Sequence, residues 1–319
     1  MLKQVFQWLS PSGARARLSV LIFHRVLPSP DPLFPDEIDA RRFDEICGWV
    51  GELCNVLPLD HAVLRLQAGT LPARAACITF DDGYGDNYQV ALPILKRHGL
   101  SATFFVSTGY LDGGCMWNDA VIEAVRRTHL SSLDLDDLIP EGAVNLPVAS
   151  VADKAAAIDY IIKQLKYRPD RERAALITQV AGRAAIRLPT DLMMTSQEVR
   201  AMRSAGMLIG AHTVSHPILA ALDADAARFE MQQSKKALEN LLGERVAFFA
   251  YPNGKPVADY SSETVAIVRD VGFDAALSTR WAAARADTDL YQIPRFTPWD
   301  RSPARFGMRL IANLRAGHT

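Results

Sequence analysis

Short apolar runs that end in turn signals alternate with helical patterns along most of this 319-residue chain. Helical patterns lie at Tyr88–His98, Gln197–Ser204 and Ala224–Leu242. Strand-like runs lie at Leu18–Phe23, Ala75–Phe80, Ala102–Val106, Leu208–Ala211, Val246–Ala250 and Ala275–Ser278. Alternation of strand, helix and strand predicts a parallel sheet with crossover helices. We therefore expect an α/β fold, specifically one barrel of parallel strands, because such barrels commonly form a single unit of about 200–250 residues.

The stretch at about 112–195 interrupts this alternation, since it contains no convincing strand. A helix is expected to begin after Ser150, whose side chain can cap it while Asp153 reinforces the first turn. We predict a single domain over residues 1–319 with a helical insertion that shapes a substrate groove. An amphipathic tail is expected at about 301–319, where arginines recur every four positions beside an apolar stripe.

Charge and cysteine content narrow the class of protein. A formal net charge of −1 gives no general attraction to nucleic acid, so we expect a neutral or mixed substrate and no nucleic-acid partner. No C-x-x-C pair occurs among Cys47, Cys54, Cys77 and Cys115, so we expect reduced, packed thiols rather than a zinc knuckle or disulfides.

The first ten residues lack a secretory h-region, and no run approaches the roughly 18 apolar residues of a spanning helix. We expect a cytoplasmic protein.

Two adjacent carboxylates, Asp81 and Asp82, end one of the strand-like runs. Successive side chains of a strand point to opposite faces, so one can bind a cation while the other stays free to take a proton. Far downstream, His212 and His216 are four positions apart, a spacing that one helical turn places on the same side. Asp, His and His could together hold a metal ion. Taken singly, the first pattern could be a turn with solvated carboxylates and the second a packed pair.

Together, Thr79–Gly83 and His212–His216 resemble the first two motifs of the NodB-type polysaccharide deacetylases, carbohydrate esterase family 4. The resemblance runs from Leu18 to about Pro298 outside the insertion, with the motifs in family order. It implies the distorted (β/α) barrel of that family. Pro217 disfavours helix at its neighbour, so the two histidines are expected on a short turn rather than inside a long helix.

The same resemblance implies a ligand set and a base. A divalent cation, commonly zinc with cobalt, nickel or manganese as alternatives, would be held by Asp82, His212 and His216. Asp81 would be the general base. In this chemistry a cation polarises the acetamide carbonyl and a water, a carboxylate takes the proton of the water, and an acid protonates the departing amine.

The sequence departs from the family pattern at two places. Phe248–Gly254 resembles the third motif but lacks the arginine often found before its proline, and Arg295 is our candidate to replace it by pairing with Asp81. A structural arginine is the alternative.

The second departure concerns the acid. No Leu-x-His-type motif follows Arg295, where many relatives place their acid. Val20–Val26 instead resembles the histidine-containing first strand of the subgroup that includes poly-N-acetylglucosamine deacetylases, which makes His24 the candidate acid, with a satisfied core histidine as the alternative. In a closed barrel, first and last strands are neighbours, so this histidine could reach the site.

Candidate substrate contacts lie near these motifs. By the resemblance, a backbone N–H near Asn253 could steady the oxyanion, although the residue could instead only shape the turn. The rings of Tyr84, Trp117 and Tyr251 could stack on sugar faces, with core packing as the alternative for each.

Our leading hypothesis is an enzyme, a metal-dependent carbohydrate N-deacetylase that removes acetyl groups from a polysaccharide, oligosaccharide or lipid-linked glycan. One alternative is a metal-dependent hydrolase of non-sugar amides or cyclic imides on the same fold. Another is an inactive carbohydrate-binding protein, suggested by the missing arginine and the relocated acid. The basic C-terminal helix is either solvated or makes weak peripheral contact with an anionic membrane, which would place the protein at the inner face of that membrane.

Overall fold

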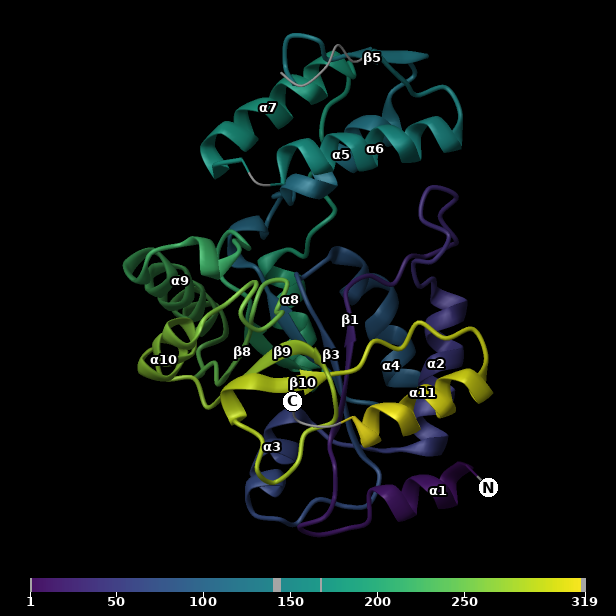
Figure 1. Ribbon diagram of the computed structural model, residues 1–319, viewed down its shortest axis with the longest axis vertical. Coiled ribbons are helices and arrows are strands. Elements are labelled where there is room, and N and C mark those ends of the chain that lie inside the picture. The colour runs from purple at the N-terminus through teal and green to yellow at the C-terminus, as the bar shows by residue number, and fades with distance from the viewer. Residues whose placement is uncertain (1, 140–144, 167, 317–319) are drawn as a thin grey trace. The chain divides into compact units, whose positions relative to one another are not determined.

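The computed structural model describes residues 2–139, 145–166 and 168–316, and it divides the chain into two compact units (Figure 1). The first unit comprises Met1–Ser29, Asp36–Leu111 and Met194–Thr319. The second comprises Pro30–Pro35 and Asp112–Met193, and therefore contains most of the stretch expected to be an insertion.

An eight-stranded sheet forms the centre of the first unit, in the order β1-β3-β4-β7-β8-β9-β10 with β2 beside β3, and every ladder in it is parallel. Its strands are β1 (Ser19–Phe23), β2 (Asn55–Val56), β3 (Ala75–Phe80), β4 (Thr103–Val106), β7 (Leu208–Ala211), β8 (Phe248–Ala250), β9 (Ala275–Trp281) and β10 (Ile293–Arg295). The sheet closes beyond β10, because the Ile22 N–H donates to the Phe296 carbonyl at 3.0 Å and the Phe296 N–H donates to the Val20 carbonyl at 2.7 Å. The predicted barrel of parallel strands is confirmed, with its first and last strands side by side.

Neighbouring side chains of one strand enter two different cores. Val20 of β1 packs in a cluster with apolar residues of the helix α3 (Leu59–Gln67), whereas the next residue, Leu21, packs in a cluster with apolar residues of other surrounding helices. Every residue of β1 and of β3 is buried. Strands buried on both faces read as continuous apolar runs, which is why these two strands could be recognised in the sequence.

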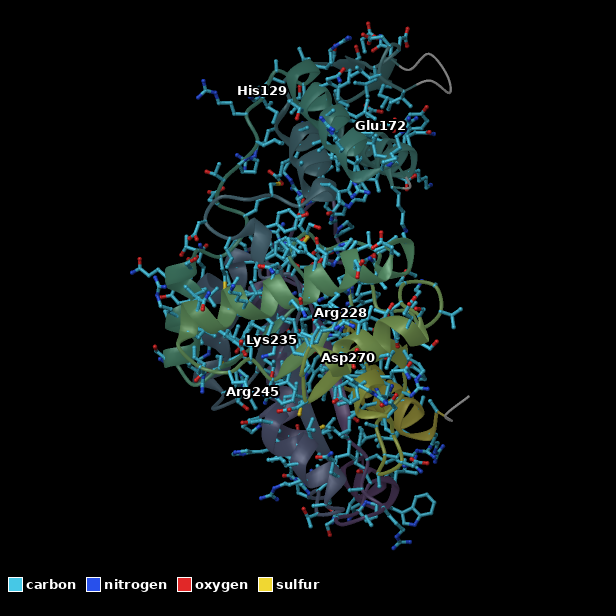
Figure 2. The ribbon with its side chains drawn as sticks, turned by 90° about the vertical axis from the view of Figure 1, so that its left-hand side faces the viewer. His129, Glu172, Arg228, Lys235, Arg245 and Asp270 are labelled. Atoms are coloured by element: carbon cyan, nitrogen blue, oxygen red, sulfur yellow. The ribbon has the colours of Figure 1, made fainter. Side chains whose placement is uncertain are left out.

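Helices surround the barrel of the first unit. Besides α3 they are α1 (Leu2–Leu9), α2 (Ala40–Leu53), α4 (Leu92–Arg97), α8 (Ser196–Ser204), α9 (Ala224–Leu242), α10 (Ser262–Asp270) and α11 (Pro303–Arg315). The predicted helix of α9 is confirmed at both ends: the Asp223 side chain caps it, and it ends at Gly243 in the left-handed conformation. Arg228 of α9 pairs with Asp270 of α10 at 3.0 Å (Figure 2). In the part of the chain that the structure describes, no helix combines the length and the apolar content needed to span a bilayer.

The C-terminal tail forms α11, as its periodicity predicts. Its apolar residues Phe306, Leu310 and Leu314 are buried in the core of the first unit, where α11 lies beside α1 from the other end of the chain (Figure 1). Burial of this stripe explains the amphipathic pattern by packing within the protein. Residues 317–319 of the predicted tail lie outside the described residues.

The second unit has its own apolar core and is not purely helical. It contains α5 (Trp117–Arg127), β5 (Ser132–Asp134), β6 (Asn145–Pro147), α6 (Val151–Leu165) and α7 (Asp170–Arg183). The predicted start of α6 is confirmed, because Ser150 and Asp153 form a reciprocal capping box. The expectation of no strand here is wrong: β5 and β6 pair as an antiparallel hairpin. Strands of three residues are too short to show an alternating pattern in the sequence.

Candidate metal centre and catalytic site

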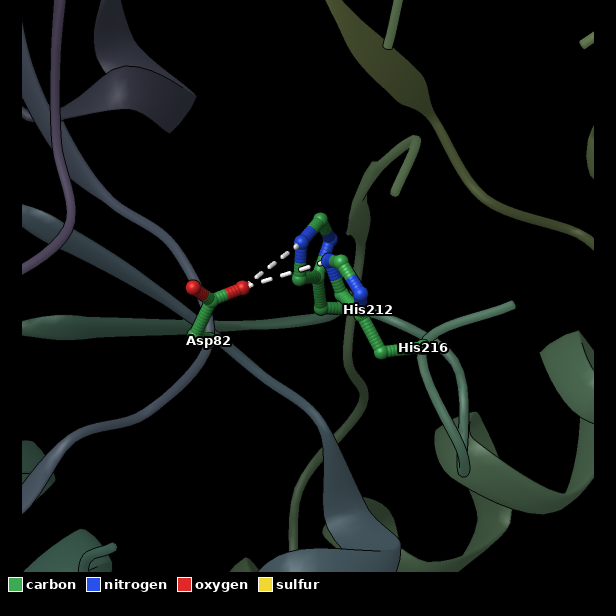
Figure 3. A group of neighbouring side chains, drawn as sticks. All are labelled: Asp82, His212 and His216. Carbon is green, nitrogen blue, oxygen red and sulfur yellow. Dashed lines mark ion pairs between the residues drawn. The ribbon is translucent and has the colours of Figure 1, made fainter. Parts of the chain in front are cut away.

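Three side chains predicted to hold a cation meet at the carboxyl ends of β3 and β7. Nε2 of His212 lies 3.4 Å from Oδ1 of Asp82, and Nε2 of His216 lies 3.3 Å from the same oxygen (Figure 3). One ligand atom from each of these residues lies within 4.8 Å of the other two. The structure therefore brings the predicted ligand set together from segments about 130 residues apart in the chain.

The two histidines are carried by an irregular turn, as the proline after His216 predicts, and not by a helix. The backbone φ angles of Asp82, Thr213 and His216 are 76°, 65° and 55°, in the left-handed region that residues with a side chain rarely adopt. Such conformations cost on the order of 1–3 kcal/mol each and persist where surrounding contacts impose them. All three lie at or between the ligands, so contacts elsewhere in the fold have to offset the strain of this site.

Contacts from the segment after β4 hold the carbonyl side of this turn. Ser107 Oγ donates to the His212 carbonyl at 3.0 Å, and the Thr108 and Gly109 N–H groups donate to the carbonyls of residues 213 and 214 at 3.1 and 2.9 Å. Gly109 has to be glycine, since a Cβ there would lie 2.7 Å from the Val214 carbonyl oxygen. Sequence reasoning missed these residues, and no motif marks them, because most of them act through backbone atoms.

The donor atoms fit a divalent cation. Nδ1 of His212 lies 2.7 Å from the Ala250 carbonyl, which can only accept, so Nδ1 carries a proton and, in the neutral ring, Nε2 has the lone pair that a cation needs. Oδ1 of Asp82 is buried and has no hydrogen-bond partner among the described residues. An orphaned carboxylate oxygen facing two imidazole nitrogens matches the oxygen and nitrogen ligands that zinc and similar metals take.

Metal binding needs an ionised Asp82 and neutral imidazoles, and electrostatics favour that form for Asp82 and His216 but not for His212. Burial opposes ionisation of Asp82, but the neighbouring histidines outweigh it and hold the pKa of its carboxyl below the ordinary value. Burial lowers the pKa of His216 to about 4, so its imidazole is neutral at pH 7. For His212 burial also favours the neutral form, but the charges of Asp81 and Asp82 outweigh it and raise the pKa. A binding cation therefore competes with a proton at His212.

Asp81 points to a different partner from its neighbour. Nη1 and Nη2 of Arg295 donate to Oδ1 and Oδ2 of Asp81, both at 2.7 Å, and Arg295 Nε donates to the Ser278 carbonyl at 2.9 Å. Asp81 and Arg295 are 2% and 1% exposed, so this bidentate pair is almost dry. Burial works against the charge on Asp81, yet Arg295 outweighs it and keeps the pKa of the carboxyl below its ordinary value. The pairing expected from the sequence is present.

His24 follows β1 beside the two carboxylates. The Asp81 N–H donates to the Phe23 carbonyl at 3.0 Å, which joins the ends of β1 and β3. Burial opposes ionisation of Asp81 and Asp82; Arg295 beside the first and His216 beside the second lower the pKa most, and the nearby imidazole of His24 has a smaller effect in the same direction. His24 is exposed, so it is not the satisfied core histidine of the alternative explanation.

Two residues that the sequence analysis missed hold the backbone around His24. Asn87 Nδ2 donates to the His24 carbonyl at 2.8 Å. The carboxylate of Asp86 accepts from the Val26 N–H at 3.1 Å and from Arg25 Nε at 2.8 Å. Asp86 and Asn87 come just after the Asp-Asp-Gly motif, and this position in the sequence could have indicated that they lie near the site.

Two of the rings predicted to contact substrate are buried. Tyr251 is 0% exposed and stacks on Tyr260 with 3.9 Å between ring centroids, so core packing accounts for it and its ring is not available to a sugar. Tyr84 is also buried, with the guanidinium of Arg25 4.8 Å from its ring centroid.

The other two proposed contacts lie in different surroundings. Trp117 belongs to the second unit, where it packs against that core and has the Arg173 guanidinium 4.8 Å from its ring. Asn253 is exposed, has a φ of 58°, and accepts a hydrogen bond from Thr279 Oγ1 on its carbonyl at 2.8 Å. This geometry gives Asn253 a turn-shaping role and leaves the role of its N–H as a prediction.

Comparisons with known proteins agree on one family. The family model described as polysaccharide deacetylase matches residues 68–132 and 159–276. YxkH of Bacillus subtilis (strain 168), which its name assigns provisionally to the polysaccharide deacetylases, is 20% identical over 282 residues, covering 88% of this chain and 71% of YxkH.

Solved structures share the fold. The Streptococcus pyogenes deacetylase PplD, in complex with acetate, superposes with a TM-score of 0.61 at 20% identity, covering 94% of this chain and 98% of PplD. IcaB from Ammonifex degensii gives a TM-score of 0.57 at 20% identity, covering 96% of this chain and 99% of IcaB.

Proposed function

Because this chain belongs to the polysaccharide deacetylase family, we propose that it is a metal-dependent N-deacetylase of N-acetylated sugars in a polysaccharide, oligosaccharide or lipid-linked glycan. The observation that carries the proposal is the convergence of Asp82, His212 and His216 beside the Asp81–Arg295 pair. His212 Nε2 lies 4.0 Å from Asp81 Oδ2, so the ligand set and the proton acceptor share one site. Acetate, which the PplD structure contains, is the product that this reaction would release.

The ligand set supports a catalytic rather than a structural metal. A divalent cation held by Asp82, His212 and His216 would polarise the acetamide carbonyl, and three protein ligands leave room for substrate. The carboxylate and imidazole donors favour zinc, with cobalt, nickel and manganese as further candidates.

The remaining groups of the chain would move protons. Asp81 takes a proton from the attacking water; each of its oxygens accepts one N–H of Arg295 and keeps a second lone pair. A carboxylate held at low pKa is a weak base, so it accepts that proton only as the new C–O bond forms. His24 gives a proton to the sugar nitrogen as the C–N bond breaks, which yields acetate and a free amine. The backbone N–H near Asn253 would stabilise the developing oxyanion.

Acetate release from N-acetylglucosamine oligomers and related glycans tests the proposal. Activity should disappear with a chelator and return with a divalent cation. Asp82→Ala and His212→Ala should lose metal in elemental analysis, whereas Asp81→Asn should keep metal and lose turnover. If fully loaded protein released no acetate from a broad glycan panel but cleaved another amide, the sugar substrate would be rejected and the non-sugar alternative preferred.

A further inference from the structure

Glu230 of α9 binds the backbone of the turn between the two histidine ligands. Its Oε2 accepts the N–H groups of Val214 and Ser215 at 2.8 and 2.9 Å. Its Oε1 accepts the Ser215 hydroxyl at 2.7 Å. One carboxylate therefore satisfies three donors within two residues of His216.

The carbonyls of the same turn accept hydrogen bonds from the segment after β4. The Val214 carbonyl accepts from Gly109 N–H at 2.9 Å, and the Ser215 carbonyl accepts from Tyr110 Oη at 2.8 Å. The N–H groups of the turn are thus held by a carboxylate on α9, and its carbonyls by the chain after β4. Hydrogen bonds to a charged acceptor are roughly twice as strong as neutral ones, which makes the carboxylate the stronger of the two contacts.

The turn needs such support because of its backbone. Thr213 and His216, on either side of the two residues that Glu230 contacts, both have positive φ. If the charge of this carboxylate were removed, as in Glu230→Gln, the two N–H groups would be held by a weaker, neutral acceptor and the turn could relax toward a more ordinary conformation. Relaxation would move the imidazole of His216 away from Asp82, since that ring lies at the end of the turn.

We propose that Glu230 is a positioning residue that sets the affinity of the site for its divalent cation by holding His216 in place. The inference rests on the metal site of the proposed function and is independent of which amide is cleaved. Loss of a group that orients a metal ligand typically weakens metal binding by about 10–100-fold.

The test measures metal affinity without substrate. Metal-free parent, Glu230→Gln and Glu239→Gln would be titrated with Zn²⁺ against a chromogenic chelator, and with Co²⁺ by its visible absorption. Glu239 is a matched control on the same helix, because it also accepts a backbone N–H, from Val246 at 3.1 Å, and pairs with Lys235. We expect Glu230→Gln to bind about 10–100-fold more weakly with an altered Co²⁺ spectrum, and Glu239→Gln to bind within about twofold of the parent.

Three outcomes would overturn the inference. Glu230→Gln could bind as tightly as the parent, both variants could weaken equally through a general loss of stability, or the parent could bind no metal. If Glu230→Gln fails to fold, Ser215→Ala removes only the hydroxyl donor and should weaken binding by a smaller factor in the same direction; unchanged binding there also overturns it. A parent that binds metal but releases no acetate would refute the proposed deacetylation and leave the role of Glu230 standing.

Discussion

Replacing Arg295 by methionine should destabilise the protein by an amount that depends on pH. The change keeps an apolar stem of similar length but removes the partner of a carboxylate that is 2% exposed. Breaking a buried pair on one side typically costs about 3–5 kcal/mol, because the other charge stays buried and unpaired. We expect the low end, about 3 kcal/mol, because His212 Nε2 remains 4.0 Å from Asp81 Oδ2 and can carry a compensating proton.

The sign of the pH dependence follows from the pKa of Asp81. In the parent this pKa is lowered, so the ionised carboxylate contributes stability above its ordinary pKa of about 4, and that contribution is lost as pH falls through the lowered value. In Arg295→Met the burial of Asp81 is no longer opposed by the arginine, so its pKa should rise above the ordinary value. Stability is then lost as pH rises through that raised pKa. The difference between parent and variant should therefore widen from about pH 5 to about pH 7.5.

Urea unfolding of the metal-free proteins at both pH values, followed by tryptophan fluorescence, measures this difference. Arg245→Met is the control, because Arg245 pairs with Asp274 at 2.6 Å where both side chains are about half exposed, and such pairs contribute roughly 0–1 kcal/mol. A deficit for Arg295→Met that is the same at both pH values would show that lost packing, and not an unpaired charge, is the cause. A deficit no larger than that of Arg245→Met would refute the reasoning entirely.

Three further predictions concern the site and its surroundings. His24→Gln should keep its metal and slow acetate release by about 10²–10⁴-fold; measured kcat equal to that of the parent would remove His24 from the reaction. Gly109→Ala should lower the free energy of unfolding in urea by about 1–3 kcal/mol and weaken metal binding, because its Cβ would meet the Val214 carbonyl oxygen at 2.7 Å. Gly182→Ala is the control: nothing lies within 4 Å of its new Cβ, so it should cause neither loss. Burial raises the pKa of Cys47 and Cys54 to about 12, so a thiol reagent at about pH 7.5 should label the partly exposed Cys115 first, and fast labelling of the other two would contradict their burial.

The sequence predicted those parts of the fold whose signal is local. β3 is a continuous apolar run because both of its faces are buried, and α9 carries its cap and its terminal glycine in the sequence. β10 has no such signal: it is three residues long, and its pairing with β9 shifts register between Ile293 and Arg295. Its existence depends on closure of the barrel, which only the folded chain reveals.

For the site, the sequence revealed which residue types could bind a metal, but it did not reveal which side chains are buried. Asp82 and the two histidines could be predicted because metal ligands must be particular side chains. Tyr251 could not be placed, because its burial depends on Tyr260 and on the carbonyl of Tyr291, which accepts its hydroxyl at 2.9 Å. Glu230 was equally hidden, since the groups it binds are mainly backbone N–H groups that every sequence contains.

The arginine on β10 also explains why two neighbouring carboxylates can serve one cation site. Arg295 neutralises Asp81, and His216 is neutral at pH 7, so with the ring of His212 neutral the three ligand side chains and the Asp81–Arg295 pair together carry one net negative charge, that of Asp82. A divalent cation there would retain one unit of positive charge, which is available to a carbonyl oxygen as it becomes negative. Without Arg295 the second carboxylate would cancel that charge. The third motif of this chain lacks the arginine that the family often has there, and the bidentate pair between Arg295 and Asp81 supports our proposal that an arginine on β10 replaces it.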